Sequence, residues 1–313
     1  MTLLRIAWLF IVATPLLMAA QEHSMCEDRK LPANVVDAHG QQILGLTTDQ
    51  FRAEYQGQLL KVKSSKFESA PQRIVLLVDT SRSVSFDPQQ WELVKTVAND
   101  MVSAGPPQAE LALATFSSTS EANVRFGLGR KAVQEAIRGL TAPPKIANTL
   151  AGETALYDAI LQAAKMFGDS QLGDVVYAIT DGLDNESKTT TGKVLLYLEQ
   201  RNIRLFVSVI HNSRFIPMPG AGGGPQVVGK AARETGGYYA ILETDKSAPL
   251  ASTTAVQQLY ALMASFYLVD IELPKDPDKP RELKLTVIDA NGKKRKATTV
   301  LHSQNVFPCG AAK

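Results

Sequence analysis

Four unbroken apolar runs, set between amphipathic stretches, constrain the fold of this chain more than any other feature of its sequence. Runs without polar alternation are typical of strands that are covered on both faces, as in parallel sheets. The runs are RIVLLVD (73–79), AELALATFS (109–117), DVVYAITD (174–181) and IRLFVSVI (203–210). Helical patterns occupy 89–104, 130–140, 154–167, 188–200, 227–235 and 253–264. The alternation predicts an α/β fold: a doubly wound, mostly parallel, Rossmann-like sheet with helices on both faces.

The segments on either side of this region alternate apolar and polar residues, as antiparallel strands do. Asn291-Gly292 in the second flank is a strong hairpin signal. The simplest packing joins both flanks in one small antiparallel β-sandwich, with the α/β domain inserted between them. The expected parts are a signal peptide (1–20), an N-terminal β segment (21–70), the α/β domain (71–264) and a C-terminal β segment (265–313).

The first twenty residues have the pattern of a secretory signal peptide. Arg5 precedes an apolar stretch that ends in Ala19-Ala20, so the mature protein is expected to begin near Gln21. Export to the periplasm or the exterior follows from this interpretation. Met18 is unfavourable near the cleavage point, which leaves an uncleaved membrane anchor as the alternative.

Two cysteines, Cys26 and Cys309, stand near the two ends of the chain. In an oxidising compartment such a pair is expected to form a disulfide. Closing so long a loop would contribute about 5 kcal/mol in the chain-entropy model. The alternative is two free thiols.

Charge and composition argue against nucleic acid as a partner. The formal net charge is +2, and the basic run Lys293–Lys296 follows a predicted hairpin turn, where solvated lysines are ordinary. The four histidines are scattered and match no zinc spacing. No G-x-S-x-G or S-x-x-K motif is present, so the sequence predicts no enzyme and no small-molecule substrate.

The first apolar run ends in an unusual set of oxygen-bearing side chains. Asp79, Ser81 and Ser83 alternate at its carboxyl end, where open parallel sheets bind ligands. One carboxylate with two hydroxyls is a set of hard donors that suits Mg²⁺, Mn²⁺ or Ca²⁺. The alternative is a turn in which Asp and Ser cap the next helix.

Two further stretches carry oxygen donors at the same predicted edge. GETALYDAI offers Thr154 at a helix start, and AITDGLDN offers Asp181 at the end of another parallel-type strand. Each has an ordinary alternative, as a helix cap or a turn residue. Because Asp79 and Asp181 both follow parallel strands, they are expected to share one edge of the sheet.

The motifs D-T-S-R-S, G-E-T-A-L-Y-D-A and T-D-G-L-D, in this order, resemble the von Willebrand factor A domain with its metal-ion-dependent adhesion site. The flanks resemble von Willebrand factor A-related proteins of acidobacteria. The resemblance implies that Asp79, Ser81, Ser83, Thr154 and Asp181 hold a divalent cation, with Mg²⁺ expected first and Mn²⁺ or Ca²⁺ as alternatives. It also implies a protein partner whose Glu or Asp carboxylate completes the coordination.

One residue departs from the family pattern. Arg82 stands where the family usually has glycine, so the backbone there must avoid a φ that only glycine adopts easily. Its charge would either repel the ion or help to hold an acidic partner. The partner surface is expected to include Arg82, Asn148, Asp184 and Ser213.

Three functions follow, in order of preference. The first is an exported, metal-dependent protein-binding module of the adhesion type. The second is a structural subunit of an envelope assembly, in which the ion only braces loops. The third is nucleotide binding through residues 224–231, where Gly224, Gly229 and Lys230 nearly spell a phosphate-binding loop but Ala231 replaces the Mg²⁺-binding hydroxyl.

Overall fold

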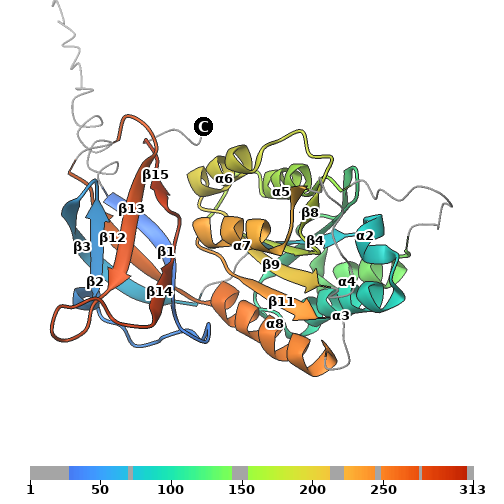
Figure 1. The fold of residues 1–313 in the computed structure, drawn as a ribbon, viewed down its shortest axis with the longest axis horizontal. Helices are drawn as coiled ribbons and strands as arrows, with labels where there is room; N and C mark the ends of the chain where they lie inside the picture. Colours follow the sequence, from blue (N-terminus) through green and yellow to red (C-terminus); the bar gives the residue numbers. More distant parts are fainter. Residues whose placement is uncertain are drawn as a thin grey trace, which may run out of the picture.

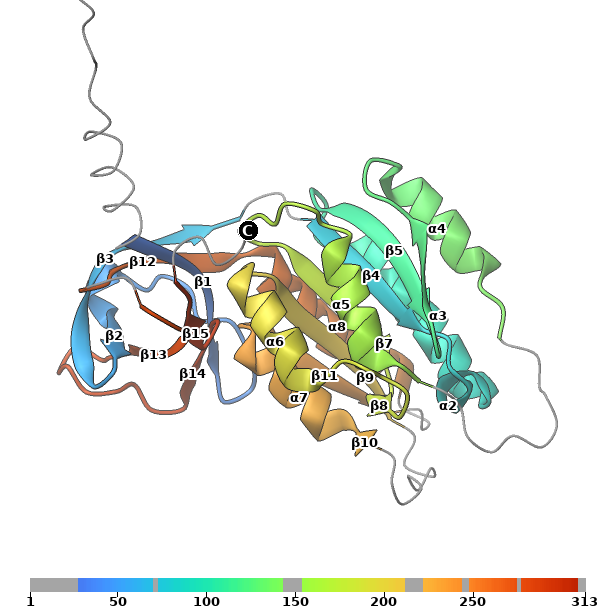
Figure 2. The same ribbon diagram turned by 90° about the horizontal axis from the view of Figure 1, so that it is seen from above.

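A computed structural model describes residues 28–69, 73–142, 154–211, 222–243, 248–274 and 277–308. In it an α/β domain and an all-β domain lie side by side (Figures 1 and 2). Within the described residues, no helix is long and apolar enough to cross a membrane. The expected signal peptide, together with Cys26 and Cys309, lies outside the described residues.

The α/β domain is built on a sheet of six strands in its described part, in the order β11-β9-β7-β4-β5-β6. All neighbouring strands are parallel except β6, which runs antiparallel to β5 at one edge. The strands are β4 (Arg73–Asp79), β5 (Glu110–Phe116), β6 (Ser120–Val124), β7 (Val175–Thr180), β9 (Arg204–His211) and β11 (Tyr239–Glu243). β4 therefore lies inside the sheet, between β7 and β5.

Helices cover both faces of this sheet, as the unbroken apolar strands require. Alternate residues of β4 point to opposite cores: Ile74 and Leu76 pack with α3, α4 and α8, whereas Val75 and Leu77 pack with α5, α6 and α7. The helices are α3 (Pro88–Ala104), α4 (Gly129–Gly139), α5 (Leu156–Lys165), α6 (Thr191–Gln200), α7 (Pro225–Glu234) and α8 (Ala248–Ala264). A short helix, α2 (Arg82–Ser85), follows β4.

The second domain is an antiparallel sheet, in its described part of seven strands, that curls around its own apolar core (Figure 2). Its order is β14-β1-β12-β3-β2-β13-β15. The strands are β1 (Asp28–Asp37), β2 (Phe51–Tyr55), β3 (Gln58–Glu68), β12 (Phe266–Glu272), β13 (Arg281–Val287), β14 (Thr298–Leu301) and β15 (Asn305–Val306), with a short helix η1 (Thr48–Gln50) before β2. Strands from before and after the α/β domain alternate in this order, so the α/β domain is inserted in the β-domain.

Two sets of hydrogen bonds join the domains where the strands of the central sheet begin. The first lies at the end of α8. Buried Arg204, at the start of β9, donates to the carbonyls of Leu262 and Met263, each at 3.1 Å. Asn34 of β1 donates to the same Leu262 carbonyl at 2.7 Å. The last turn of α8 is therefore held from both domains.

The second set joins the C-terminal segment to the α/β domain. Ser303 forms a β-bridge with Thr235. The buried carboxylate of Glu199 in α6 accepts from the backbone N–H of Gln304 at 3.0 Å and from the side chain of Asn305 at 2.8 Å. We call these contacts of Glu199, Thr235, Ser303, Gln304 and Asn305 the junction.

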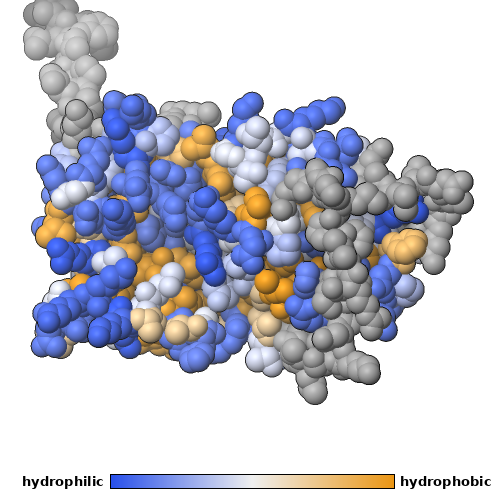
Figure 3. All heavy atoms as spheres, viewed as in Figure 1, coloured by the Kyte–Doolittle hydropathy of each residue, from blue (hydrophilic) through white to orange (hydrophobic). Residues whose placement is uncertain are grey.

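The predicted fold class is confirmed, and the main elements lie close to their predicted bounds. α6 begins at Thr191 and not at Lys188, because the side chain of Thr190 caps it by accepting from the N–H of Lys193. Two edge strands, β6 and β11, were not predicted. In the view of Figure 1 the surface is largely hydrophilic, with hydrophobic residues in patches between the polar ones (Figure 3).

Candidate metal centre

Three loops meet at the carboxyl edge of the central sheet, which faces away from the β-domain (Figure 1). β4 ends at Asp79, and its neighbour β7 ends directly before Asp181. The third is the short segment of Thr154 and Ala155 before α5, in which Ala155 donates to the carbonyl of Ser117 just past β5 at 2.8 Å. Since β7, β4 and β5 are adjacent and parallel, these three loops lie at one edge.

Asp79 is fully buried, and each of its carboxylate oxygens accepts a hydrogen bond. Oδ1 accepts from the N–H of Ser81 at 2.8 Å, and Oδ2 accepts from the hydroxyl of Thr180 at 2.6 Å. The Thr180 hydroxyl in turn accepts from the N–H of Gly182 at 3.0 Å. The orientation of the Asp79 carboxylate is therefore fixed by its own loop and by the end of β7.

The two serines connect Asp79 to the second aspartate. The hydroxyls of Ser81 and Ser83 lie 3.0 Å apart and share a hydrogen bond. Ser83 also hydrogen-bonds the carboxylate of Asp181, whose Oδ1 accepts from the N–H of Leu183 at 3.0 Å. Asp79, Ser81, Ser83 and Asp181 thus form one continuous set of oxygen-bearing side chains.

The two carboxylates are costly to ionise in this setting. Burial, and next the nearby charge of Asp181, raise the pKa of Asp79 to about 7, against the lowering effect of its hydrogen bonds with Ser81 and Thr180. Burial also raises the pKa of Asp181, although its hydrogen bond with Ser83 acts in the opposite direction. A cation between the two loops would offset the cost of holding two negative charges there.

Thr154 is buried and stands two residues before the first residue of α5. Its N–H donates to the side-chain oxygen of Asn185 at 2.7 Å, and its carbonyl accepts from the N–H of Asn185 at 3.0 Å. Asn185 lies in the segment that follows Asp181, so the loop of the second aspartate holds the third loop in place.

The donor set fits a hard divalent cation. Carboxylate and hydroxyl oxygens suit Mg²⁺, Mn²⁺ and Ca²⁺ better than the softer metals that prefer nitrogen or sulfur. Among the described residues, no group of three or more His, Cys, Asp or Glu side chains could hold a metal ion. An ion bound by Asp79 and Asp181 would take its other protein oxygens from Ser81, Ser83 and Thr154.

Arg82 lies on the surface of this edge. It is the first residue of α2, half-buried, and its guanidinium lies over the ring of Phe86, 5.8 Å from the centroid. Phe86 is 58% exposed. Arg82 is not among the described non-glycine residues with a positive φ, so the position does not require the glycine that is usual in the family.

The other predicted partner residues differ in their surroundings. Asp184 Oδ1 accepts from the N–H of Leu156 at 2.9 Å and from the hydroxyl of Ser187 at 2.5 Å, so its carboxylate braces the start of α5. Asn148 and Ser213 lie outside the described residues.

Sequence reasoning did not single out three side chains of this edge. Thr180 orients Asp79, Asn185 bonds to Thr154, and the ring of Phe86 packs against the guanidinium of Arg82. Thr180 stands in the T-D-G-L-D motif itself, so the motif contained a signal for it. Asn185 acts across a sequence distance of 31 residues, which no local pattern reveals.

The glycine-rich stretch before α7 has a structural role. Gly224, with φ of 105°, precedes the first helical residue Pro225, and its N–H donates to the carbonyl of Gly182 at 2.7 Å. A two-residue strand, β10 (Gly222–Gly223), pairs with β8 (Leu183–Asp184). The side chain of Lys230 is 77% exposed and lies 3.6 Å from Glu234.

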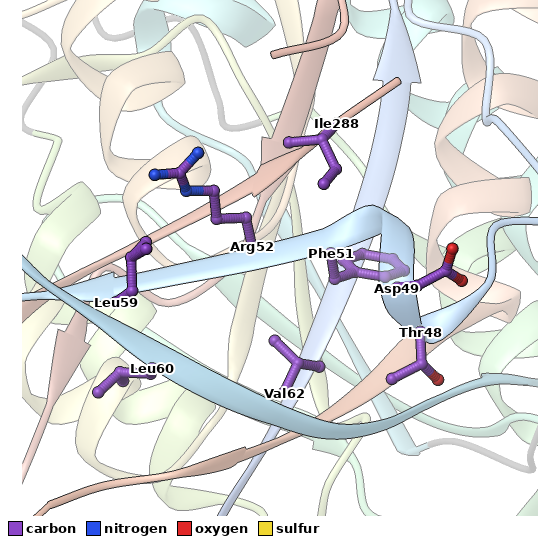
Figure 4. A pocket seen from close by; sticks show the side chains of 8 residues that line it. All are labelled: Thr48, Asp49, Phe51, Arg52, Leu59, Leu60, Val62 and Ile288. Atoms are coloured by element: carbon purple, nitrogen blue, oxygen red, sulfur yellow. The ribbon is translucent and has the colours of Figure 1, made fainter. Parts of the chain in front are cut away.

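A hollow of about 630 Å³ opens on the β-domain (Figure 4). It lies where β3 leaves β2 to pair with β12. Its lining residues are Thr48, Asp49, Phe51, Arg52, Leu59, Leu60, Val62 and Ile288.

The fold and this edge define a class of protein: an inserted, doubly wound α/β domain with an oxygen-donor site at the carboxyl ends of its strands. Residues 74–183, about a third of the chain, match the family profile of the von Willebrand factor type A domain. The chain therefore contains a von Willebrand factor type A domain. All five predicted ion-binding residues lie within the matched stretch. No curated protein matched the chain.

Solved structures with a similar course of the chain include the following three. One is a von Willebrand factor type A protein from Catenulispora acidiphila (12% identity, TM-score 0.46, covering 90% of this chain and 73% of that one). Another is the manganese-loaded TRAP protein of Plasmodium vivax (17% identity, TM-score 0.44, covering 77% of this chain and 96% of that one). The third is proximal thread matrix protein 1 from the mussel byssus, with a zinc-occupied MIDAS motif (17% identity, TM-score 0.49, covering 66% of this chain and 49% of that one). This chain spans about half the length of the mussel protein.

Proposed function

We propose that this protein is an exported, metal-dependent protein-binding module that uses a divalent cation to recognise an acidic residue of a partner protein. One observation carries the proposal. Asp79, Ser81, Ser83 and Asp181 form a continuous set of oxygen donors at the carboxyl edge of a von Willebrand factor type A domain. We infer no catalytic role for the protein.

The residues have different roles in this proposal. Ser81, Ser83 and Thr154 offer neutral hydroxyl oxygens, whereas Asp79 and Asp181 offer charge. Because both oxygens of Asp79 already accept hydrogen bonds, Asp79 suits a role of orienting the serines or holding a water. If Asp79 does not touch the ion and the hydroxyls are neutral, Asp181 is the one carboxylate bound directly, and a divalent cation keeps one positive charge unbalanced among its direct ligands.

That residual charge favours an anionic oxygen from outside the protein. The carboxylate of a Glu or Asp in a partner is the commonest such group in proteins, and Mg²⁺ usually retains exchangeable waters that it can displace. The surface beside the site supports a peptide partner, because Arg82 offers a cationic group and Phe86 an exposed apolar ring. Mg²⁺ is the expected ion, and the same donors accept Mn²⁺ or Ca²⁺.

Calorimetric titration of the metal-free protein with Mg²⁺, Mn²⁺ and Ca²⁺ tests the first half of the proposal. We expect one ion per chain for the wild type and loss of binding in Asp181→Ala. Asp278→Ala is a matched control, because the side chain of Asp278 is 72% exposed on the β-domain. Absence of binding for all three ions, or an Asp181→Ala variant that binds like the wild type, would reject the metal centre.

Capture of immobilised peptides tests the second half. Peptides with one Glu or Asp are compared with the same peptides carrying Gln or Asn. We expect the loaded protein to retain only the acidic set and to release it when EDTA is added. Equal retention of both sets would reject recognition of a carboxylate.

The structural role remains the second candidate, because one observation favours it. Both oxygens of Asp79 are engaged within the protein, as they would be if the ion only braced neighbouring loops. In that case removal of the metal lowers the unfolding temperature, and acidic peptides are not captured in its presence either. The two experiments together therefore separate the candidates.

A further inference from the structure

We propose that Asn185 and Ser187 are positioning residues of the metal centre, which keep Thr154 at a fixed place relative to Asp181. The inference rests on the proposed metal-binding function of this edge. It concerns two side chains that are not expected to touch the ion and that the motifs do not include.

The evidence begins with the first turn of α5, whose N–H groups have no partners inside the helix. Other loops satisfy all of them. The N–H of Leu156 donates to Asp184 Oδ1 at 2.9 Å, while those of Tyr157 and Asp158 donate to the hydroxyl of Ser187 at 3.0 and 3.1 Å. The start of the helix is therefore capped by a segment that is distant in sequence.

Thr154 itself is held by a reciprocal pair of bonds. Its N–H donates to Asn185 Oδ1 at 2.7 Å, and the N–H of Asn185 returns a bond to its carbonyl at 3.0 Å. The N–H of Glu186 adds a second bond to the same carbonyl at 3.1 Å. Both backbone polar groups of Thr154 thus bond to the segment that follows Asp181.

The contact continues one step further along both segments. The carboxylate of Asp158 accepts from the N–H groups of Lys188 and Thr189, each at 2.9 Å. Residues 184–189 and 154–158 are therefore joined along their whole length, and we call this set of bonds the clamp.

The clamp makes two of the three loops move as one. The clamp begins at Asp184, only three residues after Asp181. It also includes Thr154, which stands two residues before the first residue of α5. A displacement of Thr154 away from Asp181 would break several of these bonds. Groups that orient metal ligands without touching the metal typically change metal affinity by about 10- to 100-fold when they are removed.

Charge-neutral variants separate positioning from electrostatics. Asn185→Ala removes the acceptor for Thr154, and Ser187→Ala removes the acceptor for Tyr157 and Asp158. Ser187→Thr retains a hydroxyl and serves as the rescue variant. Asn291→Ala, in an exposed turn of the β-domain, is the control for loss of an asparagine.

Two readouts are needed, one with the metal and one without it. Free Mn²⁺, measured by electron paramagnetic resonance, gives the affinity, and amide hydrogen exchange of the metal-free protein reports on the clamp. We expect Asn185→Ala and Ser187→Ala to bind Mn²⁺ about 10- to 100-fold more weakly. We expect Ser187→Thr and Asn291→Ala to stay within about twofold of the wild type. The amide of Thr154 should exchange faster in Asn185→Ala, even without metal.

The outcomes are distinguishable from those that test the metal centre itself. If the amide of Thr154 exchanges faster but Mn²⁺ binds as in the wild type, the clamp is only structural and the inference is wrong. If the wild type itself binds no Mn²⁺, the proposed metal centre and this inference fall together. Should Asn185→Ala not fold, the comparison of Ser187→Ala with Ser187→Thr decides by the same criterion.

Discussion

The hydroxyl of Thr180 donates a hydrogen bond of 2.6 Å to the carboxylate of Asp79, and both side chains are completely buried. The bond joins the carboxyl ends of β7 and β4, the two strands from which the two aspartate loops depart. The end of β7, which leads directly into Asp181, therefore also sets the orientation of the Asp79 carboxylate.

Thr180→Val tests this relationship, because valine has nearly the same shape but no hydroxyl. We expect Mn²⁺ affinity to fall about tenfold, since Asp79 loses an orienting partner. The free energy of unfolding should fall by about 1–2 kcal/mol, because the carboxylate and the N–H of Gly182 each lose a hydrogen bond. Isothermal titration and guanidinium unfolding measure the two effects. Thr180→Ser, which keeps the hydroxyl, should restore both, and a Val variant with unchanged affinity would contradict the prediction.

Arg82→Gly restores the residue that is usual in the family. We expect cation affinity to rise by about two- to fivefold, because a positive charge near the ion is removed. Arg82→Lys, which keeps the charge, should bind the ion as the wild type does. Retention of acidic peptides should decrease in the Gly variant, and a variant that gains ion affinity without losing peptides would show that Arg82 takes no part in recognition.

Glu199→Ala probes the junction between the domains. The substitution removes the acceptor for Gln304 and Asn305, so we expect a loss of about 1–3 kcal/mol in the free energy of unfolding. Glu135→Ala on the exposed face of α4 is the control and should change stability by less than about 0.5 kcal/mol. Mn²⁺ affinity should not change, because the junction lies at the opposite end of the central sheet. A large change in affinity would show that the two ends are coupled.

His302 predicts a dependence of stability on pH. The ring is buried, its Nε2 accepts from the N–H of Leu285 at 3.2 Å, and Nδ1 faces the carbonyl of Ser303 at 2.7 Å. Burial lowers the pKa of His302 below its ordinary value of 6.5, despite the opposing effect of Ser303. As pH falls below about 6.5, the unfolded chain therefore takes up a proton that the folded protein resists.

The contribution of His302 to stability is thus complete above about pH 6.5 and is lost as pH falls toward the folded-state pKa. The loss is at most about 1.4 kcal/mol per pH unit for one group. Urea unfolding between pH 5 and 7 (a range set by the ordinary histidine pKa) gives this slope. We expect His302→Gln to reduce it by that amount, and equal slopes for the two proteins would contradict the prediction.

The sequence predicted most of the central sheet, because its strands are buried on both faces and their apolar runs are unbroken. β6 has the sequence SEANV and lies at an edge, where polar residues are tolerated and the apolar signal disappears. β11 (YAILE) is only five residues long, and so short an apolar run cannot be told from part of a helix by its pattern alone. Edge strands of this kind are defined by their neighbours more than by their own composition.

In the candidate site, too, some residues could be predicted from the sequence and others could not. Asp79, Ser81, Ser83, Thr154 and Asp181 could be named in advance, because each stands in a short motif beside a predictable strand or helix. Asn185 could not, because its role lies in hydrogen bonds to Thr154, which only the fold brings near. Thr180 stands in the T-D-G-L-D motif, but its bond to Asp79 appears only in the folded chain. The disulfide, Asn148 and Ser213 stay predictions, since they lie outside the described residues.

Between the described parts of the two domains the chain runs from β3 toward β4 and from α8 into β12, and the second passage lies beside the hydrogen bond of Asn34 to Leu262. The first described residue, Asp28, and the last strand, β15, also belong to the β-domain. If the protein were held by either end while a partner pulled on the carboxylates, the tension would run lengthwise through the central strands. The junction bonds of Glu199 and Ser303 would then share that load with the two covalent crossings.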